Sequence, residues 1–293
     1  MKKGKKITQY ESFTEANLPH TRPQVILSVY KTRALFIFEI SLLLVLFCLP
    51  LFIWSIIIRL YIDNIPNGLL EDMSNKADIL KDVFMWTMIK NGVNILLFGV
   101  AGIGFGGAIH VLQKLVWNQL AMLSDFFEGM KKNIDKYIFW GILLGISFFI
   151  FEFVVSGMPL TNLNTFVRML LYGLAFLQLV LFAIFISYLF LQNEYYYLDP
   201  FHIVTNAFKF TIKSFIPMVG FVIAIMLPYF LIFIHSFVIN IVATFLFLFL
   251  VSFGLIPLIL HADYQFDKNI NKDQYPEIYD RGVYRQGKIE LPK

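Results

Sequence analysis

The sequence predicts an all-α, polytopic membrane protein with six transmembrane helices and both termini in the cytoplasm. Six apolar stretches are each long enough to cross a bilayer core, which takes about 20 residues. Lysine and arginine concentrate on alternate connections between these stretches. Hydrophobic residues make up 58% of the chain and charged residues 15%, whereas soluble proteins average about 45–50% and 25%. The three observations indicate a multi-pass protein whose main partner is the lipid bilayer.

The six predicted spans follow the apolar stretches in chain order. They comprise residues 33–61, 92–112, 138–157, 166–191, 215–235 and 237–260. Aromatic residues gather near several span ends, as in the interfacial belts of membrane proteins. These residues are Tyr61, Trp117, Tyr137, Trp140, Tyr195, Tyr196 and Tyr197. We expect their side chains to lie at the membrane–water interface.

The distribution of basic residues sets the orientation of the spans. Of the 24 lysines and arginines, 19 fall in residues 1–33, in the connections after the second and fourth spans, or after residue 260. Because basic residues are retained on the cytoplasmic side, these segments are expected in the cytoplasm. The chain then divides into a basic segment 1–33 with a surface helix, a membrane domain 34–260 and a cytoplasmic tail 261–293.

The external segment 62–91 of the membrane domain contains one more predicted helix. A turn signal at residues 64–68 comes first, and apolar residues then recur every three or four positions. They are Leu70, Met73, Ala77, Leu80, Phe84 and Met88. We expect this helix to lie over the outer mouth of the bundle.

Amphipathic surface helices are predicted before spans one, three and five, at residues 21–33, 117–137 and 201–214. The second and third carry apolar side chains at helical spacing and lysines on the other face, which is typical of helices at a membrane surface. The stripe on 201–214 comprises Ile203, Ala207, Phe210 and Ser214. The helix in 117–137 either anchors the chain to the membrane or docks a partner through its exposed acids, Glu128 and Asp135. The three units of surface helix and spans are either a true repeat or separate insertions that each need a basic lead-in.

Glycines in the second and third spans predict close helix packing. Small residues let helix backbones approach in lipid, where packing drives association. The glycines on the packing stripe are Gly99, Gly102, Gly106, Gly141 and Gly145. The alternative is a substrate path lined by the backbone of residues 102–107.

Few ionisable residues lie within the spans: Glu39, His110, Glu152 and Arg168. A charge at the bilayer centre costs about 2.5–3.5 kcal/mol on insertion scales, so such residues are candidates for function. All four are near span ends, and Glu152 can pair with Arg168 across a short hairpin. Gln178 is a mid-span polar residue that suits either an interhelical hydrogen bond or a ligand contact.

Motifs of soluble enzymes are absent from the sequence. It has no zinc-type His-Glu pair, nucleophile elbow, Walker lysine or dinucleotide loop. Its single cysteine, Cys48, excludes an internal disulfide and a thiolate metal site. We therefore predict no catalytic, metal or cofactor-binding residues and no cofactor. The net charge of +4 reflects the basic amino-terminal segment and does not require a nucleic acid partner.

Residues 104–137 resemble the YesL-like family of bacterial integral membrane proteins, whose function is undefined. The similar text is Gly106-Gly-Ala-Ile-His110, Gln113-Lys114 and Asp125-Phe-Phe-Glu-Gly-Met-Lys-Lys-Asn133. Gly107 stands where the family usually has proline. The resemblance implies an accessory role in carbohydrate uptake and brings no catalytic residues.

Three functions remain open at this point. The first is a non-catalytic membrane component that assists solute or carbohydrate uptake and binds transporter subunits. The second is a self-contained transporter or channel, and the third is a membrane enzyme that acts on lipid or lipid-linked sugar. The sequence indicates neither the substrate nor the oligomeric state.

Overall fold

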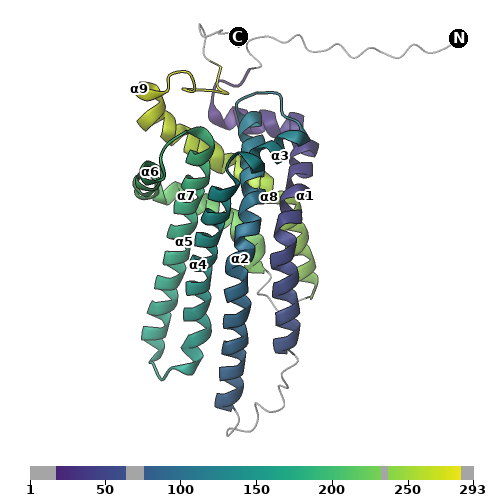
Figure 1. Cartoon of the computed structure of the whole chain (residues 1–293), viewed down its shortest axis with the longest axis vertical. Helices are drawn as coiled ribbons and strands as arrows, with labels where there is room; N and C mark the ends of the chain where they lie inside the picture. The colour runs from purple at the N-terminus through teal and green to yellow at the C-terminus, as the bar shows by residue number, and fades with distance from the viewer. Residues whose placement is uncertain (1–17, 64–75, 232–236, 285–293) are drawn as a thin grey trace, which may run out of the picture.

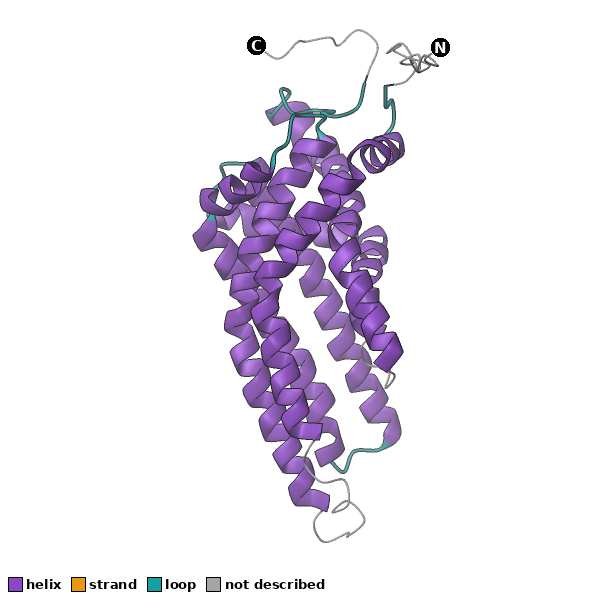
Figure 2. Cartoon of the chain, turned by 90° about the vertical axis from the view of Figure 1, so that its right-hand side faces the viewer, coloured by secondary structure: helices purple, strands orange, loops and turns teal. Residues whose placement is uncertain are grey.

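The computed structural model describes residues 18–63, 76–231 and 237–284. This part of the chain is all helical and forms an elongated bundle (Figures 1 and 2). Six longer helices build the bundle: α1 (Arg22–Asp63), α2 (Lys76–Val116), α4 (Ile134–Gly157), α5 (Thr165–Tyr195), α7 (Phe215–Leu231) and α8 (Phe237–Phe266). Three shorter helices lie at one end of it: α3 (Leu123–Lys132), α6 (Pro200–Lys213) and α9 (Lys272–Gln274).

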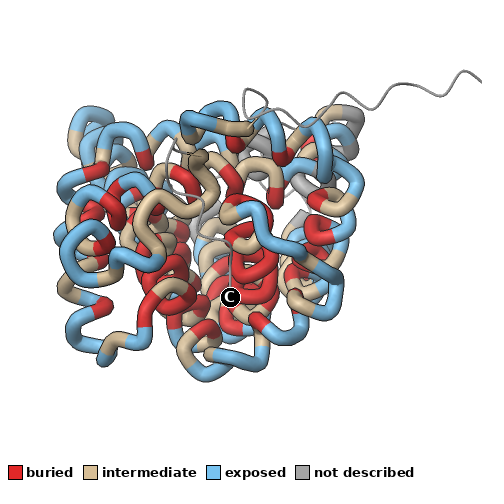
Figure 3. Tube along the Cα trace, turned by 90° about the horizontal axis from the view of Figure 1, so that it is seen from above, coloured by how far each residue is buried: buried red, intermediate tan, exposed pale blue. Residues whose placement is uncertain are grey.

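Four helices are long and apolar enough to cross a membrane: α1, α2, α4 and α5. The pair α6 and α7 gives a fifth candidate if it counts as one broken span, bent by 94°. Large apolar side chains such as Leu35, Phe166 and Ile216 are more than three-quarters exposed on the outer surface. Figure 3 shows buried positions toward the middle of the bundle and exposed ones around its rim. A soluble monomer rarely exposes so much apolar surface, so the prediction of a helical, multi-pass membrane protein is confirmed.

The described chain begins and finishes at the same end of the bundle. The Tyr284 amide donates to the Pro19 carbonyl over 2.8 Å. We call this end, where α3, α6 and α9 also lie, the termini end, and the opposite one the distal end (Figure 1). The α4–α5 connection, a 3₁₀ turn at Met158–Leu160 followed by Thr161 and Asn162, lies at the distal end.

The predicted helix over the outer mouth is wrong for the residues that the structure describes. From Lys76 onward the chain already belongs to α2, which runs without a break into the second span. The breaking residues, Pro66 and Gly68, come before Lys76, and neither proline nor glycine occurs again until Gly92. Nothing therefore ends the helix between the external segment and the span. Leu70 and Met73 lie outside the described residues.

The helices predicted at 117–137 and 201–214 correspond to two separate short helices, α3 and α6. The first of these two is shorter than predicted. Asn118 adopts a positive φ of 55°, and α3 begins only at Leu123 and ends before Asn133, whose φ of −144° breaks it from α4. The helix predicted at 201–214 corresponds to α6, where Asp199 accepts from the His202 amide and Pro200 occupies the first turn, a favoured helix start. The predicted stripe of α6 faces the bundle, since Ile203, Ala207, Phe210 and Ser214 are all buried. Before span one, α1 departs from helical geometry at Arg33 (φ −128°, ψ 16°), so residues 22–32 form a helical segment set off from the rest of α1.

The glycines of the second and third spans lie at the contact between α2 and α4. A Cβ added at Gly102 would lie 3.1 Å from the Gly141 Cα and still closer to the Tyr137 carbonyl oxygen. A Cβ at Gly145 would lie 2.8 Å from the Ile95 Cα. The two backbones therefore touch along a glycine seam, defined here as Gly99, Gly102, Gly106, Gly141 and Gly145. Such an approach is possible only where side chains are missing.

Candidate functional site

A buried carboxylate in the last turn of α5, Glu194, collects three donors from three other helices. It accepts from His110 Nδ1 of α2 over 2.6 Å, from Lys132 Nζ of α3 over 3.0 Å and from Tyr137 OH of α4 over 2.9 Å. The Glu194 side chain is only 2% exposed. We call these four residues the Glu194 cluster. It joins α2, α3, α4 and α5 at the termini end.

In the Glu194 cluster, an opposite charge and hydrogen-bond donors compensate the buried carboxylate. A buried carboxylate is stable only when charges and donors compensate the loss of water. The Lys132 ammonium, 28% exposed, supplies the opposite charge and also lies over the Tyr197 ring at 5.6 Å. His110 Nε2 is buried without a hydrogen-bond partner. Both carboxylate oxygens of Glu194 accept from donors on other helices, so the arrangement holds these helices together.

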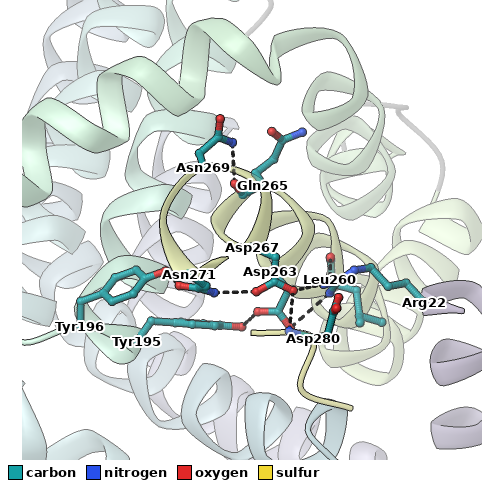
Figure 4. Close-up of polar contacts among 10 residues, drawn as sticks. All are labelled: Arg22, Tyr195, Tyr196, Leu260, Asp263, Gln265, Asp267, Asn269, Asn271 and Asp280. Carbon is teal, nitrogen blue, oxygen red and sulfur yellow. Dashed lines mark hydrogen bonds and ion pairs between the residues drawn. The ribbon is translucent and has the colours of Figure 1, made fainter. Parts of the chain in front are cut away.

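A second polar group lies beside the first, at the end of α8, and is drawn in Figure 4. Arg22 pairs with Asp267 and lies 3.8 Å from Asp263. Tyr195 donates its hydroxyl to Asp263. Tyr196 OH donates to Asn271 Oδ1 over 2.5 Å, and Asn271 Nδ2 donates to Asp267 Oδ1 over 2.7 Å. Figure 4 shows the two tyrosines entering from one side and Arg22 from the other. We call the set Arg22, Tyr195, Tyr196, Asp263, Asp267 and Asn271 the Asp263 cluster.

Three consecutive residues at the end of α5, the last of them just beyond the helix, connect the two clusters. Glu194 turns toward α2, α3 and α4, whereas Tyr195 and Tyr196 turn toward α8 and the tail. The tail folds back through a π-helical turn at Asp267–Asn271, and the Asp280 amide donates to Asp267 Oδ2 over 3.1 Å. Residues of the tail predicted as a cytoplasmic extension are thus fastened to the bundle and to the start of α1.

Burial raises the pKa of Asp263 to about 7, above about 3.9 for an unfolded chain. The folded state therefore binds this proton more tightly than the unfolded state. The stabilisation from protonation is complete below about pH 4 and is lost as the pH rises through about 7. Burial also raises the pKa of Asp267, in the same direction, while burial lowers the pKa of His261, which acts oppositely.

We expect the melting temperature of the protein to fall between about pH 4 and pH 7, and to fall less in an Asp263→Asn variant. The asparagine keeps an acceptor for the Tyr195 hydroxyl but carries no charge to bury. Thermal unfolding in detergent across this pH range measures both slopes. Parallel slopes for the two proteins would mean that Asp263 does not titrate there.

The four ionisable residues predicted within the spans lie in different surroundings and do not form one site. His110 joins the Glu194 cluster, whereas Glu39 is exposed on the outer face of α1. Glu152 is 8% exposed in the distal half of α4. Arg168 donates to the Thr161 carbonyl over 2.5 Å, and no ion pair joins it to Glu152 in the structure.

The mid-span polar residues make interhelical hydrogen bonds. Gln178 Nε2 donates to Ser147 Oγ over 2.8 Å, and Asn94 Nδ2 donates to Ser55 Oγ over 3.3 Å. Both docking candidates, Glu128 and Asp135, are exposed at the termini end.

Sequence reasoning missed the acidic centres of both clusters. Tyr137 and Tyr196 were expected in an aromatic belt, but they are 1% and 3% exposed and donate to polar groups inside the bundle. Trp140, 4% exposed, is buried as well. A signal was available, since Glu194 and Asp263 each stand at the inner end of a long apolar stretch, next to a tyrosine.

Comparisons of the chain with protein-family models, with curated proteins and with solved structures find no match. Within residues 18–63, 76–231 and 237–284, no group of three or more His, Cys, Asp or Glu side chains is arranged to hold a metal ion. The function has to be argued from the arrangement of this chain alone.

Proposed function

We propose that this protein is a six-span, non-catalytic component of the bacterial cytoplasmic membrane that assists the uptake of a solute, such as an oligosaccharide, by holding a transporter subunit. The termini end faces the cytoplasm in this proposal. The apolar lengths of α7 and α8 support two spans beyond the four long helices, and the concentration of lysine and arginine supports the orientation. The carbohydrate part of the proposal rests on the resemblance of residues 104–137 to the YesL-like family.

The firm attachment of α3 is the observation that carries the docking role. Lys114 Nζ pairs with Asp125 Oδ1 over 3.1 Å at the start of α3, and Lys132 pairs with Glu194 at its end. Between them Phe126 is fully buried, and Gly129 lies directly against His110. A helix that served only as a lipid anchor would need an apolar face and basic residues, not an ion pair at each end that ties it to other helices. The fixed helix presents Glu128 outward on a rigid support.

The glycine seam favours this role over a self-contained transporter with a path along residues 102–107. The backbones of α2 and α4 meet there, so no path runs between these two helices. A polar solute also needs polar groups along its route, and the described polar side chains gather mainly at the termini end.

We expect a Glu128→Lys, Asp135→Lys double variant to lose its partner while still inserting in the membrane. Reversing two exposed charges changes the complementarity of an interface at little cost to folding. The measurement is the yield of a transporter subunit co-purified from native membranes, compared with the yield of the variant in the membrane fraction.

The matched control reverses two exposed acids of the tail, Asp273→Lys and Glu277→Lys, which adds the same charge elsewhere at the termini end. Recovery of the partner should persist in the control. Equal recovery from both double variants would remove the docking role of α3.

The orientation predicts the outcome of cysteine labelling in a Cys48→Ser background. A cysteine at Asn162, exposed in the distal connection, should react with an impermeant maleimide added to intact cells. Cysteines at Glu128 or Asn269 should react only after lysis. Both positions lie in segments rich in lysine and arginine, which are retained on the cytoplasmic side. The reverse pattern would place the termini end outside.

A further inference from the structure

The middle of the bundle contains an apolar cavity of about 220 Å³. Six helices contribute to its wall: α1, α2, α4, α5, α7 and α8. Among its described lining residues, only Cys48 and Ser187 have polar side-chain atoms, and Ser187 Oγ already donates to the Ala183 carbonyl. The described lining therefore offers little hydrogen bonding to a ligand or to water.

A cavity of this kind does not hold water but does hold hydrocarbon. An engineered apolar cavity of about 150 Å³ in another protein stays dry and binds benzene or xenon. The space here is larger and equally apolar, and an unfilled cavity forfeits the contacts that a packed interior would make. Hydrocarbon chains surround the bundle once it is in a bilayer, so an occupant is at hand.

The shape and depth of the cavity match one leaflet of a membrane. Its lining runs from Phe98 to Ile109 on α2 and from Leu179 to Phe190 on α5, about 16 Å in each case at 1.5 Å per residue. Half of a hydrocarbon core of about 30 Å is nearly the same length. On both helices these residues occupy the half of the helix nearer the termini end, and Tyr137 of the Glu194 cluster stacks on Phe190.

We propose that this cavity binds one acyl chain of a phospholipid from the leaflet at the termini end. The small side chains of Ala101 and Ala183 leave the space, and Tyr137 of the Glu194 cluster stacks on Phe190, the lining residue of α5 nearest the termini end. The acyl chain fills the space between the long helices and the α7–α8 pair, so it serves as part of the packing of the bundle.

Photolabelling of the full-length protein tests the proposal. The protein is reconstituted in vesicles of phosphatidylethanolamine and phosphatidylglycerol with a trace of a phospholipid that carries a diazirine within its acyl chain. After irradiation, adducts are mapped by mass spectrometry. We expect adducts on residues of the lining, such as Leu179 and Phe105, in addition to adducts on the outward-facing Leu170 and Leu174.

Two variants that fill the cavity, Ala183→Phe and Ser187→Leu, should lower the yield of cavity adducts about tenfold. The larger side chain takes up the volume that the acyl chain would occupy. Adducts at Leu170 and Leu174 should persist. The matched control is Gly173→Phe on the same helix, where an added Cβ has nothing within 4 Å; it should leave the cavity adducts unchanged. If one filled variant does not fold, the other and the wild-type map still decide.

A separate arm replaces the labelled phospholipid with a free diazirine fatty acid. Cavity labelling by the free acid alone would assign the site to fatty acids and overturn the phospholipid proposal. Wild-type adducts confined to outward-facing residues, or cavity adducts of equal yield in the filled variants, would show that no chain enters. None of these outcomes depends on whether α3 docks a partner.

Discussion

Replacing Glu194 with alanine is expected to destabilise the folded protein by about 3 kcal/mol. Removing one member of a buried ion pair typically costs about 3–5 kcal/mol, because the remaining charge stays uncompensated. The lower end applies here, since the Lys132 ammonium is 28% exposed and can reach water. His110 Nδ1 and Tyr137 OH would lose their shared acceptor inside the bundle, and each unsatisfied buried donor adds to the cost.

Unfolding in mixed micelles by increasing fractions of a denaturing detergent measures this loss. A Glu194→Gln variant should lose less, because its amide oxygen still accepts from one or two of the donors. The control is Glu128→Ala, an exposed carboxylate whose removal should stay within about 0.5 kcal/mol of the wild type. If Glu194→Ala and Glu128→Ala were equally stable, the Glu194 cluster would not hold the helices together.

The sequence predicted the helices well because the signals for them are local. Long apolar stretches, the glycines within each span and the apolar stripe on residues 201–214 are each visible within one short segment of the sequence. The error at the outer mouth has the same origin. Apolar periodicity from Leu80 to Met88 predicts a helix correctly but does not say whether that helix ends before Gly92 or continues through it.

The polar clusters could not be predicted in this way, because their members are far apart in the sequence. His110 and Glu194 are 84 positions apart, and Arg22 and Asp267 are 245 apart. Near a span end, an acid that faces cytoplasm and an acid that faces the bundle have the same neighbours in the sequence. Only the packing of α5 between α4 and α8 decides that Glu194 and Asp263 turn inward.

Substituting Gly102 with leucine is expected to have the other large effect, a loss of more than about 3 kcal/mol. Overpacking a filled interior typically costs about 1–3 kcal/mol. The cost is higher here because the first added atom meets the Tyr137 carbonyl, which belongs to the backbone of α4 and cannot rotate away. The two helices would have to separate, and Tyr137 would move relative to Glu194.

A graded series on α2 isolates this effect. Gly102→Ala should already destabilise, and Gly102→Leu should destabilise further, as measured by unfolding in mixed micelles. Gly92 lies on the same helix with nothing within 4 Å of an added Cβ, so Gly92→Ala should be neutral or stabilising by about 0.5–1 kcal/mol, the usual gain over glycine within a helix. The two alanine variants therefore differ in sign although the chemical change is identical. Similar stabilities for them would mean that α2 and α4 do not approach through the glycine seam, and the space at residues 102–107 would again be available as a substrate path.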